Sequence, residues 1–83
     1  MNICVVSSFE GKAEDFMSMM AGFGEEMKSV ASDVDIGVVS EKEGFCKVIT
    51  MANVIDNDRF QEMMSSPKMT EWDTNHKNTD IIY

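Results

Sequence analysis

The pattern of apolar and polar positions predicts six elements in the order strand, helix, strand, strand, helix, strand. Residues 2–9 alternate with small or apolar side chains on both faces, which is typical of a central strand covered on two sides. From Ala13 to Val30 the period becomes helical, and one apolar stripe holds Phe16, Met19, Met20, Phe23, Met27 and Val30. Gly22 and Gly24 lie inside this helix and weaken it by about 1 kcal/mol each relative to Ala. Close packing against the sheet, a kink and a widened cavity are three interpretations of these glycines.

The middle of the chain predicts a hairpin. Residues 34–39 alternate as a strand, residues 41–44 form a polar turn, and residues 45–55 return as an antiparallel partner. This third strand is apolar on both of its faces, as the first strand is.

The second helix begins after a run of helix-starting residues, Asp56-Asn57-Asp58, in which Asp58 and Gln61 form a capping pair. The helix must break before Pro67, because proline in a helix interior loses a hydrogen bond and clashes with the preceding turn. Ser66 as the N-cap and Pro67 at the first helical position predict a restart that runs to His76. Residues 80–83 then form a short last strand.

This order predicts one α+β domain over residues 1–83, a ferredoxin-like βαββαβ sandwich with a four-stranded antiparallel sheet and two helices on one face. Two helices cover one face of a sheet, yet the first and third strands are apolar on both faces. An exposed apolar face of roughly several hundred Å² usually marks an interface. We therefore expect a homodimer that packs sheet to sheet and forms an α/β barrel. The alternative is a monomer with an unusually apolar open face.

Composition excludes several classes of function. The net charge of −8, with seven scattered basic residues, argues against a nucleic-acid partner. No stretch approaches the roughly 18 apolar residues of a membrane span, and the first residues lack the pattern of a signal peptide. Cys4 and Cys46 fall inside predicted strands and are expected to be small buried thiols. We therefore expect a cytoplasmic protein without a membrane partner.

Three segments carry a resemblance to a known group: "NICVVSSFEG", "KAEDFMSMM" and "RFQEMMSSPKMTEW". They resemble the dimeric α/β-barrel superfamily, which includes the antibiotic-biosynthesis-monooxygenase-like proteins, and the resemblance covers nearly the whole chain. It implies a cleft between sheet and helices as the place where a ligand binds. Members include cofactor-free oxygenases, haem-degrading enzymes, isomerases and small proteins without assigned activity, so the resemblance alone selects no chemistry.

The candidate site combines four ligand-binding residues, Phe16, Phe23, Met63 and Trp72, with His76 as the catalytic residue. His76 is the sole histidine, and histidine is the residue type most often used for proton transfer at physiological pH. It stands one turn after Trp72 on the restarted helix. Two structural interpretations compete with this site. A histidine near a helix C-terminus commonly interacts with the helix dipole, and a stripe of methionine and aromatic residues commonly fills a core.

Two functional hypotheses follow. In the first, a small homodimer binds or converts an apolar or aromatic metabolite in a sheet–helix cleft, without a cofactor. In the second, the chain is a non-enzymatic dimeric interaction module without a ligand pocket. We expect no metal, since one histidine without clustered ligands does not make a metal site. An internal cavity distinguishes the two hypotheses.

Overall fold

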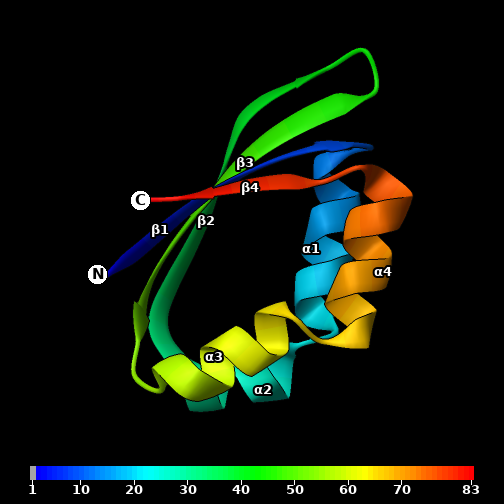
Figure 1. The fold of residues 1–83 in the computed structure, drawn as a ribbon. Helices are drawn as coiled ribbons and strands as arrows, with labels where there is room; N and C mark the ends of the chain where they lie inside the picture. The colour runs from blue at the N-terminus through cyan, green and yellow to red at the C-terminus, as the bar shows by residue number, and fades with distance from the viewer. Residues whose placement is uncertain (1) are drawn as a thin grey trace.

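The computed structural model describes residues 2–83; Met1, which the single-domain prediction includes, lies outside them. In chain order the elements are β1 (Ile3–Glu10), α1 (Ala13–Ala21), α2 (Gly24–Val30), β2 (Ala31–Lys42), β3 (Phe45–Val54), α3 (Asn57–Met64), α4 (Pro67–His76) and β4 (Thr79–Ile82). The strands pair antiparallel in the order β2-β3-β1-β4, and the helices lie on one side of the sheet (Figure 1). This arrangement confirms the predicted ferredoxin-like α+β fold.

The first helix differs from its prediction because it is broken in two. The N–H of Gly22 donates to the carbonyls of Ser18 and Met19, and the N–H of Phe23 donates to Met20, so the last turn of α1 tightens into i to i−3 bonds. Helix α2 then begins at Gly24 in a new direction (Figure 1). Of the three interpretations of the glycines, the kink comes nearest, although the change of direction is sharp enough to end α1 and start α2.

The second helix breaks where the sequence predicts. Ser66 caps α4, its Oγ accepting a hydrogen bond from the N–H of Met69 at 3.3 Å, and Pro67 takes the first helical position. The start of α3 differs from its prediction. Asp56, and not Asp58, is the capping residue, because its Oδ1 accepts from the N–H of Arg59 at 3.1 Å.

The hairpin is longer than its pattern suggests. Strand β2 extends three residues before and three after the predicted stretch and shifts register twice along β3, once after Ser32 and once after Val38. These irregularities interrupt the alternation from which a strand is recognised. The turn itself consists of Glu43 and Gly44, both with positive φ (55° and 81°), which is the combination of a type I′ turn.

The two faces of the sheet differ in what covers them. The helix-covered face carries the buried side chains Val5, Ser7, Phe9, Cys46, Val48 and Ala52, and the core forms where they meet the helices. The other face, called the open face below, has a central rung of cross-strand neighbours, Gly37-Ile49-Val6-Ile81, flanked by the rungs Asp35-Met51-Cys4 and Ser40-Lys47-Ser8-Thr79. Beyond these, Ser32-Asn53 and Lys42-Phe45-Glu10 form the two end rungs. Large apolar side chains remain exposed there, among them Met51 and Ile81.

The two cysteines occupy opposite faces. Cys46 is buried under the helices, as predicted, and burial, with a smaller contribution from Glu41, raises the pKa of its thiol. Cys4 is half-buried on the open face, so the prediction of a buried thiol is wrong for this residue in the isolated chain. Among residues 2–83, no helix is long and apolar enough to cross a membrane.

Candidate functional site: an apolar cavity with a polar end

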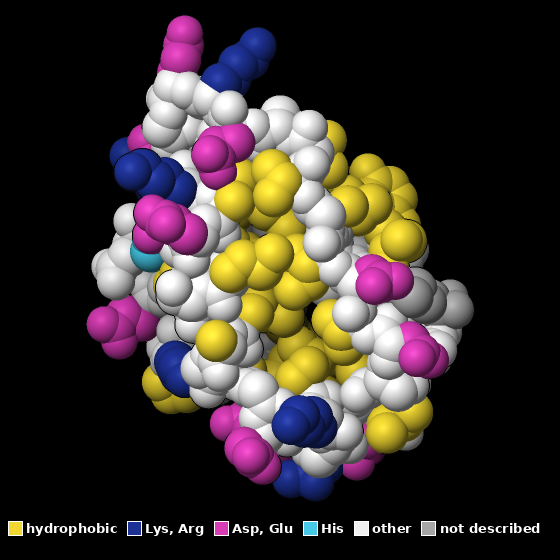
Figure 2. Space-filling model, turned by 180° about the vertical axis from the view of Figure 1, so that it is seen from behind, with side chains coloured by type: hydrophobic (Ala, Val, Ile, Leu, Met, Phe, Trp, Pro, Cys, Tyr) yellow, Lys and Arg dark blue, Asp and Glu magenta, His cyan; other side chains and the backbone are white. Residues whose placement is uncertain are grey.

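An apolar cavity of about 40 Å³ lies between the sheet and the helices. Figure 2 shows hydrophobic side chains gathered in a hollow between these two layers. The residues that line the cavity come from all four helices, from three strands and from the loop before β4: Val5, Ser7, Phe16, Met19, Met20, Met27, Thr50, Phe60, Met64, Met69, Asn78 and Asp80.

The two helix breaks account for the position of this cavity. Met20 comes just before the break between α1 and α2, and Met64 comes just before the break between α3 and α4. Because both helical segments change direction there, they do not lie flat along the sheet, and flexible methionine side chains fill the space incompletely.

A lysine joins the two breaks. Lys68 Nζ donates to the carbonyl oxygen of Gly22 at 2.8 Å and lies 4.6 Å from the centroid of the Phe23 ring. A Cβ on Gly22 would come within 2.5 Å of that ammonium nitrogen. Gly22 therefore admits the lysine, and it does not itself widen the cavity. Gly24 has open space where its Cβ would be.

An outer groove adjoins the cavity along β2. It has a volume of about 500 Å³ and includes Val34 and Ile36 on one side and Met17 on the other. Met20 and Met27 line both the groove and the inner cavity. These two side chains therefore separate the cavity from the solvent-facing groove.

The polar end of the cavity is a hydrogen-bonded network. Ser7 Oγ donates to Asp80 Oδ1 at 2.6 Å, and Asn78 Nδ2 donates to both Asp80 Oδ1 and Asp73 Oδ1 at 2.9 Å. A carboxylate only accepts hydrogen bonds, so the nitrogen of the Asn78 amide faces the two acids. Two buried oxygen atoms, Thr50 Oγ1 and Asn78 Oδ1, find no partner among the described residues.

Unpartnered buried oxygens are unfavourable for folding. Each costs about 1–3 kcal/mol relative to a hydrogen-bonded one. Burial raises the pKa of Asp73, the Asn78 hydrogen bond lowers it, and the negative charge of Asp80 raises it again. A fold rarely retains unpartnered buried oxygens without a reason, and the binding of a ligand is one such reason.

The structure brings one of the five predicted site residues to this cavity. Phe16 lines it. Phe23 and Met63 lie in the adjoining hydrophobic core and are not among the lining residues. Trp72 and His76 also lie outside the lining, and Trp72 packs against Phe16.

His76 belongs to an aromatic cluster at the end of α4. Its ring stacks on Trp72 at 4.3 Å between centroids, and Trp72 meets Phe9 at 5.1 Å and Phe16 at 5.9 Å. His76 Nδ1 lies 3.1 Å from the carbonyl oxygen of Trp72. A carbonyl only accepts, so Nδ1 carries the proton and Nε2 is left as the basic nitrogen of the neutral ring. The catalytic role of His76 stays a prediction.

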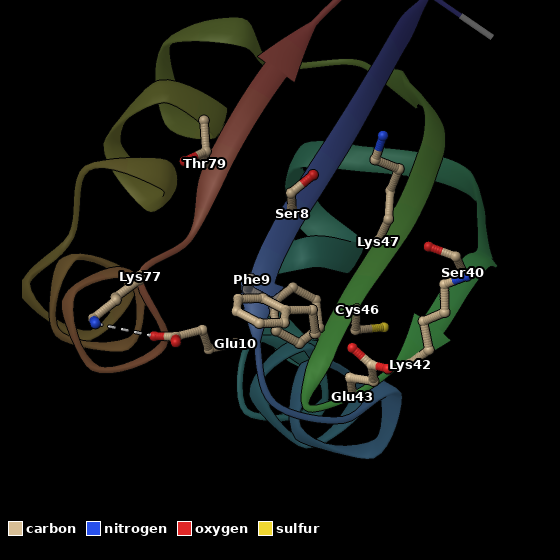
Figure 3. Close-up of a pocket in the computed structure, with 11 residues that line it drawn as sticks. Ser8, Phe9, Glu10, Ser40, Lys42, Glu43, Cys46, Lys47, Lys77 and Thr79 are labelled. Carbon is tan, nitrogen blue, oxygen red and sulfur yellow. Dashed lines mark ion pairs between the residues drawn. The ribbon is translucent and has the colours of Figure 1, made fainter.

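A second concave region lies near the hairpin and extends onto the open face (Figure 3). It has a volume of about 580 Å³, and Lys42, Lys47 and Lys77 contribute to its rim. Lys77 pairs with Glu10 at 3.4 Å, but both side chains are largely exposed, so the pair contributes little. Despite its size, this region is a shallow surface, and we regard the deeper apolar cavity between sheet and helices as the candidate site. No group of three His, Cys, Asp or Glu side chains within residues 2–83 is placed to hold a metal ion.

Reasoning from the sequence missed the polar end of the cavity. The available signal was Ser7, a polar residue at a core-facing position of an otherwise apolar strand face. Ser7 pairs directly with Asp80 on β4. Val5, the next residue on the same face of β1, pairs with Thr50 on β3, so the three polar side chains lie close together.

Solved structures with the same fold include proteins from the superfamily that the sequence resembles. SnoaB, a cofactor-independent oxygenase from Streptomyces nogalater, is 17% identical with a TM-score of 0.54, over 98% of this chain and 89% of its own. A candidate antibiotic biosynthesis monooxygenase from Deinococcus radiodurans is 10% identical with a TM-score of 0.55, over the same shares of the two chains. No protein-family model and no curated protein matches this sequence at a significant level.

These likenesses confirm the predicted ferredoxin-like fold over nearly the whole chain, and it is the fold that these monooxygenase-like proteins share. At such low identity they show the fold alone. The de novo designed protein Ferredog-Diesel shares the fold as well, with a TM-score of 0.61 at 11% identity, over 98% of this chain and 82% of its own. Because a designed protein and an oxygenase share this architecture, function has to be argued from the cavity.

Proposed function

We propose that this chain is a homodimer that binds a small apolar or aromatic metabolite in the cavity between sheet and helices, without a cofactor. The observation that carries this proposal is the pairing of two buried oxygens, Thr50 Oγ1 and Asn78 Oδ1, with an otherwise apolar lining. Apolar walls with a few convergent polar groups are the usual composition of a small-molecule site.

The cavity is small, so its lining side chains must rearrange to admit a ligand. About 40 Å³ holds no more than a few water molecules, so a larger ligand enters only if side chains move. Met20 and Met27 stand between this cavity and the outer groove of about 500 Å³. Rotation of these two unbranched side chains joins the two spaces into a site of ordinary ligand size.

The open face supports the homodimer. Its central rung is apolar, with Ile49, Val6 and Ile81 side by side, while the rung on one side of it carries Lys47 and the rung on the other side carries Asp35. A two-fold axis running along the central rung places the Lys47 rung of one copy opposite the Asp35 rung of the other. The charges of these two flanking rungs are then complementary.

Phenol, a small aromatic alcohol, tests binding when the methionine methyl groups are followed by NMR. We expect the methyl resonances of Met20 and Met27 to shift most, because they separate the cavity from the groove. Met51 lies on the open face and is the internal control. If phenol at about 10 mM, a concentration that detects millimolar affinity, leaves Met20 and Met27 unmoved, the cavity does not bind such ligands.

The predicted catalytic residue is tested with the same titration. His76→Ala removes the basic nitrogen and one ring of the aromatic cluster. A changed phenol affinity with little loss of stability would support a place for His76 in the site, and an unchanged affinity would remove His76 from it.

A further inference from the structure

The charges around the cavity are of one sign. Asp80 is the one charged side chain among the described residues that line it, and Asp73 stands behind Asn78 as a second acid. The lining contains no Lys, Arg or His from residues 2–83. An anionic ligand would therefore lose its hydration and meet a negative charge without a compensating cation.

The polar atoms at this end are mostly acceptors. Both hydrogens of the Asn78 amide are directed to Asp73 and Asp80, which leaves Oδ1 as an acceptor alone. The Ser7 hydroxyl uses its hydrogen on Asp80 and also keeps acceptor capacity. Thr50 Oγ1 has a free hydrogen and free lone pairs.

We infer, building on the proposed function, that this site selects a neutral ligand that carries a hydroxyl group on an apolar body and rejects carboxylates. A hydroxyl donates to Asn78 Oδ1 and also accepts from Thr50 Oγ1, whereas a ketone or an ether can only accept. The apolar remainder of the ligand packs against the methionine and phenylalanine side chains of the cavity.

Three probes of similar shape separate these features. Phenol and toluene differ by a hydroxyl in place of a methyl group, and benzoate adds a negative charge. We expect phenol to bind about tenfold more tightly than toluene, because one well-made buried hydrogen bond changes an affinity by roughly this factor. Benzoate should cause no shift of the Met20 and Met27 methyl resonances at concentrations that saturate the phenol shift.

Thr50→Val tests the assignment with a substitution of nearly equal shape. It removes one of the two unpartnered oxygens from the cavity, so the preference for phenol over toluene should fall by about threefold or more. Thr79→Val is the matched control, because Thr79 lies on the open face of the same sheet. It should leave the preference unchanged.

The outcomes distinguish the two proposals. If neither phenol nor toluene binds, the proposed function fails. If toluene binds as tightly as phenol, or if benzoate competes with phenol, the cavity is a ligand site but the hydroxyl selectivity is wrong. An undiminished preference in Thr50→Val would also overturn this selectivity, and the comparison of probes on the unmodified protein holds even if that variant does not fold.

Discussion

Asp73 shows at the level of one residue how the polar network affects stability. Burial raises the pKa of its carboxyl group, and so does the charge of Asp80, against the hydrogen bond from Asn78. With a raised pKa, the folded chain binds more protons than the unfolded chain at mildly acidic pH. The contribution of Asp73 to stability therefore falls as the pH rises through that window.

Asp73→Asn should consequently stabilise the protein at pH 7. The gain should be at most about 1 kcal/mol, because the Asp73 side chain is only partly buried and water screens its charge. It should vanish below the ordinary Asp pKa of about 4, where the carboxyl is protonated in both the folded and the unfolded state. Urea unfolding at neutral and acidic pH measures it, with Glu71→Gln on the exposed side of the same helix as the control. A variant that is less stable at pH 7, or a gain that does not change with pH, would contradict this account.

The sequence reveals an apolar residue such as Phe16 more readily than a polar one such as Thr50. Helical spacing alone places Phe16 on the inner stripe. Whether the Thr50 hydroxyl finds a partner depends on cross-strand register and on the path of the loop that carries Asn78. Neither follows from a local pattern, since a threonine within a strand is compatible with either face.

At the level of elements, the two helix breaks differ in how far they could be predicted. Pro67 forces one break chemically, because its ring excludes a continuous helix. Gly22 and Gly24 only permit the other, and the same glycines are compatible with close packing. What fixes the break is a contact between elements, the hydrogen bond from Lys68 on α4 to the Gly22 carbonyl.

Lys68→Met tests this contact. Methionine keeps most of the side-chain length but removes the ammonium group, so the hydrogen bond and the interaction with the Phe23 ring are both lost. We expect a loss of about 1 kcal/mol in the free energy of unfolding, together with faster hydrogen exchange in α2. Lys42→Met is the matched control, since the described residues offer the Lys42 side chain no hydrogen bond or ion pair. Equal effects of the two substitutions would show that the lysine does not hold the break.

At the level of the whole molecule, the two faces of the sheet predict opposite effects of one substitution. Val5 is 6% exposed under the helices, so Val5→Lys should unfold the chain. Ile49 lies in the middle of the open face, so Ile49→Lys should leave a folded monomer. Light scattering at micromolar concentration should give about twice the 9.3 kDa chain mass for the unmodified protein and the single chain mass for Ile49→Lys. A monomeric unmodified protein would end the homodimer proposal.

The same proposal predicts how the two copies are oriented, because the two rungs that flank the central rung of the open face carry charges of opposite sign. Lys47→Asp should weaken the dimer by roughly 1 kcal/mol, since it places a second acid opposite the Asp35 rung of the partner copy. Adding Asp35→Lys to that variant exchanges the charges of both rungs and should restore most of the lost association. Dissociation constants from sedimentation equilibrium measure both steps. If the double variant associates more weakly than Lys47→Asp alone, these rungs do not face each other, and the two sheets stack about a different axis.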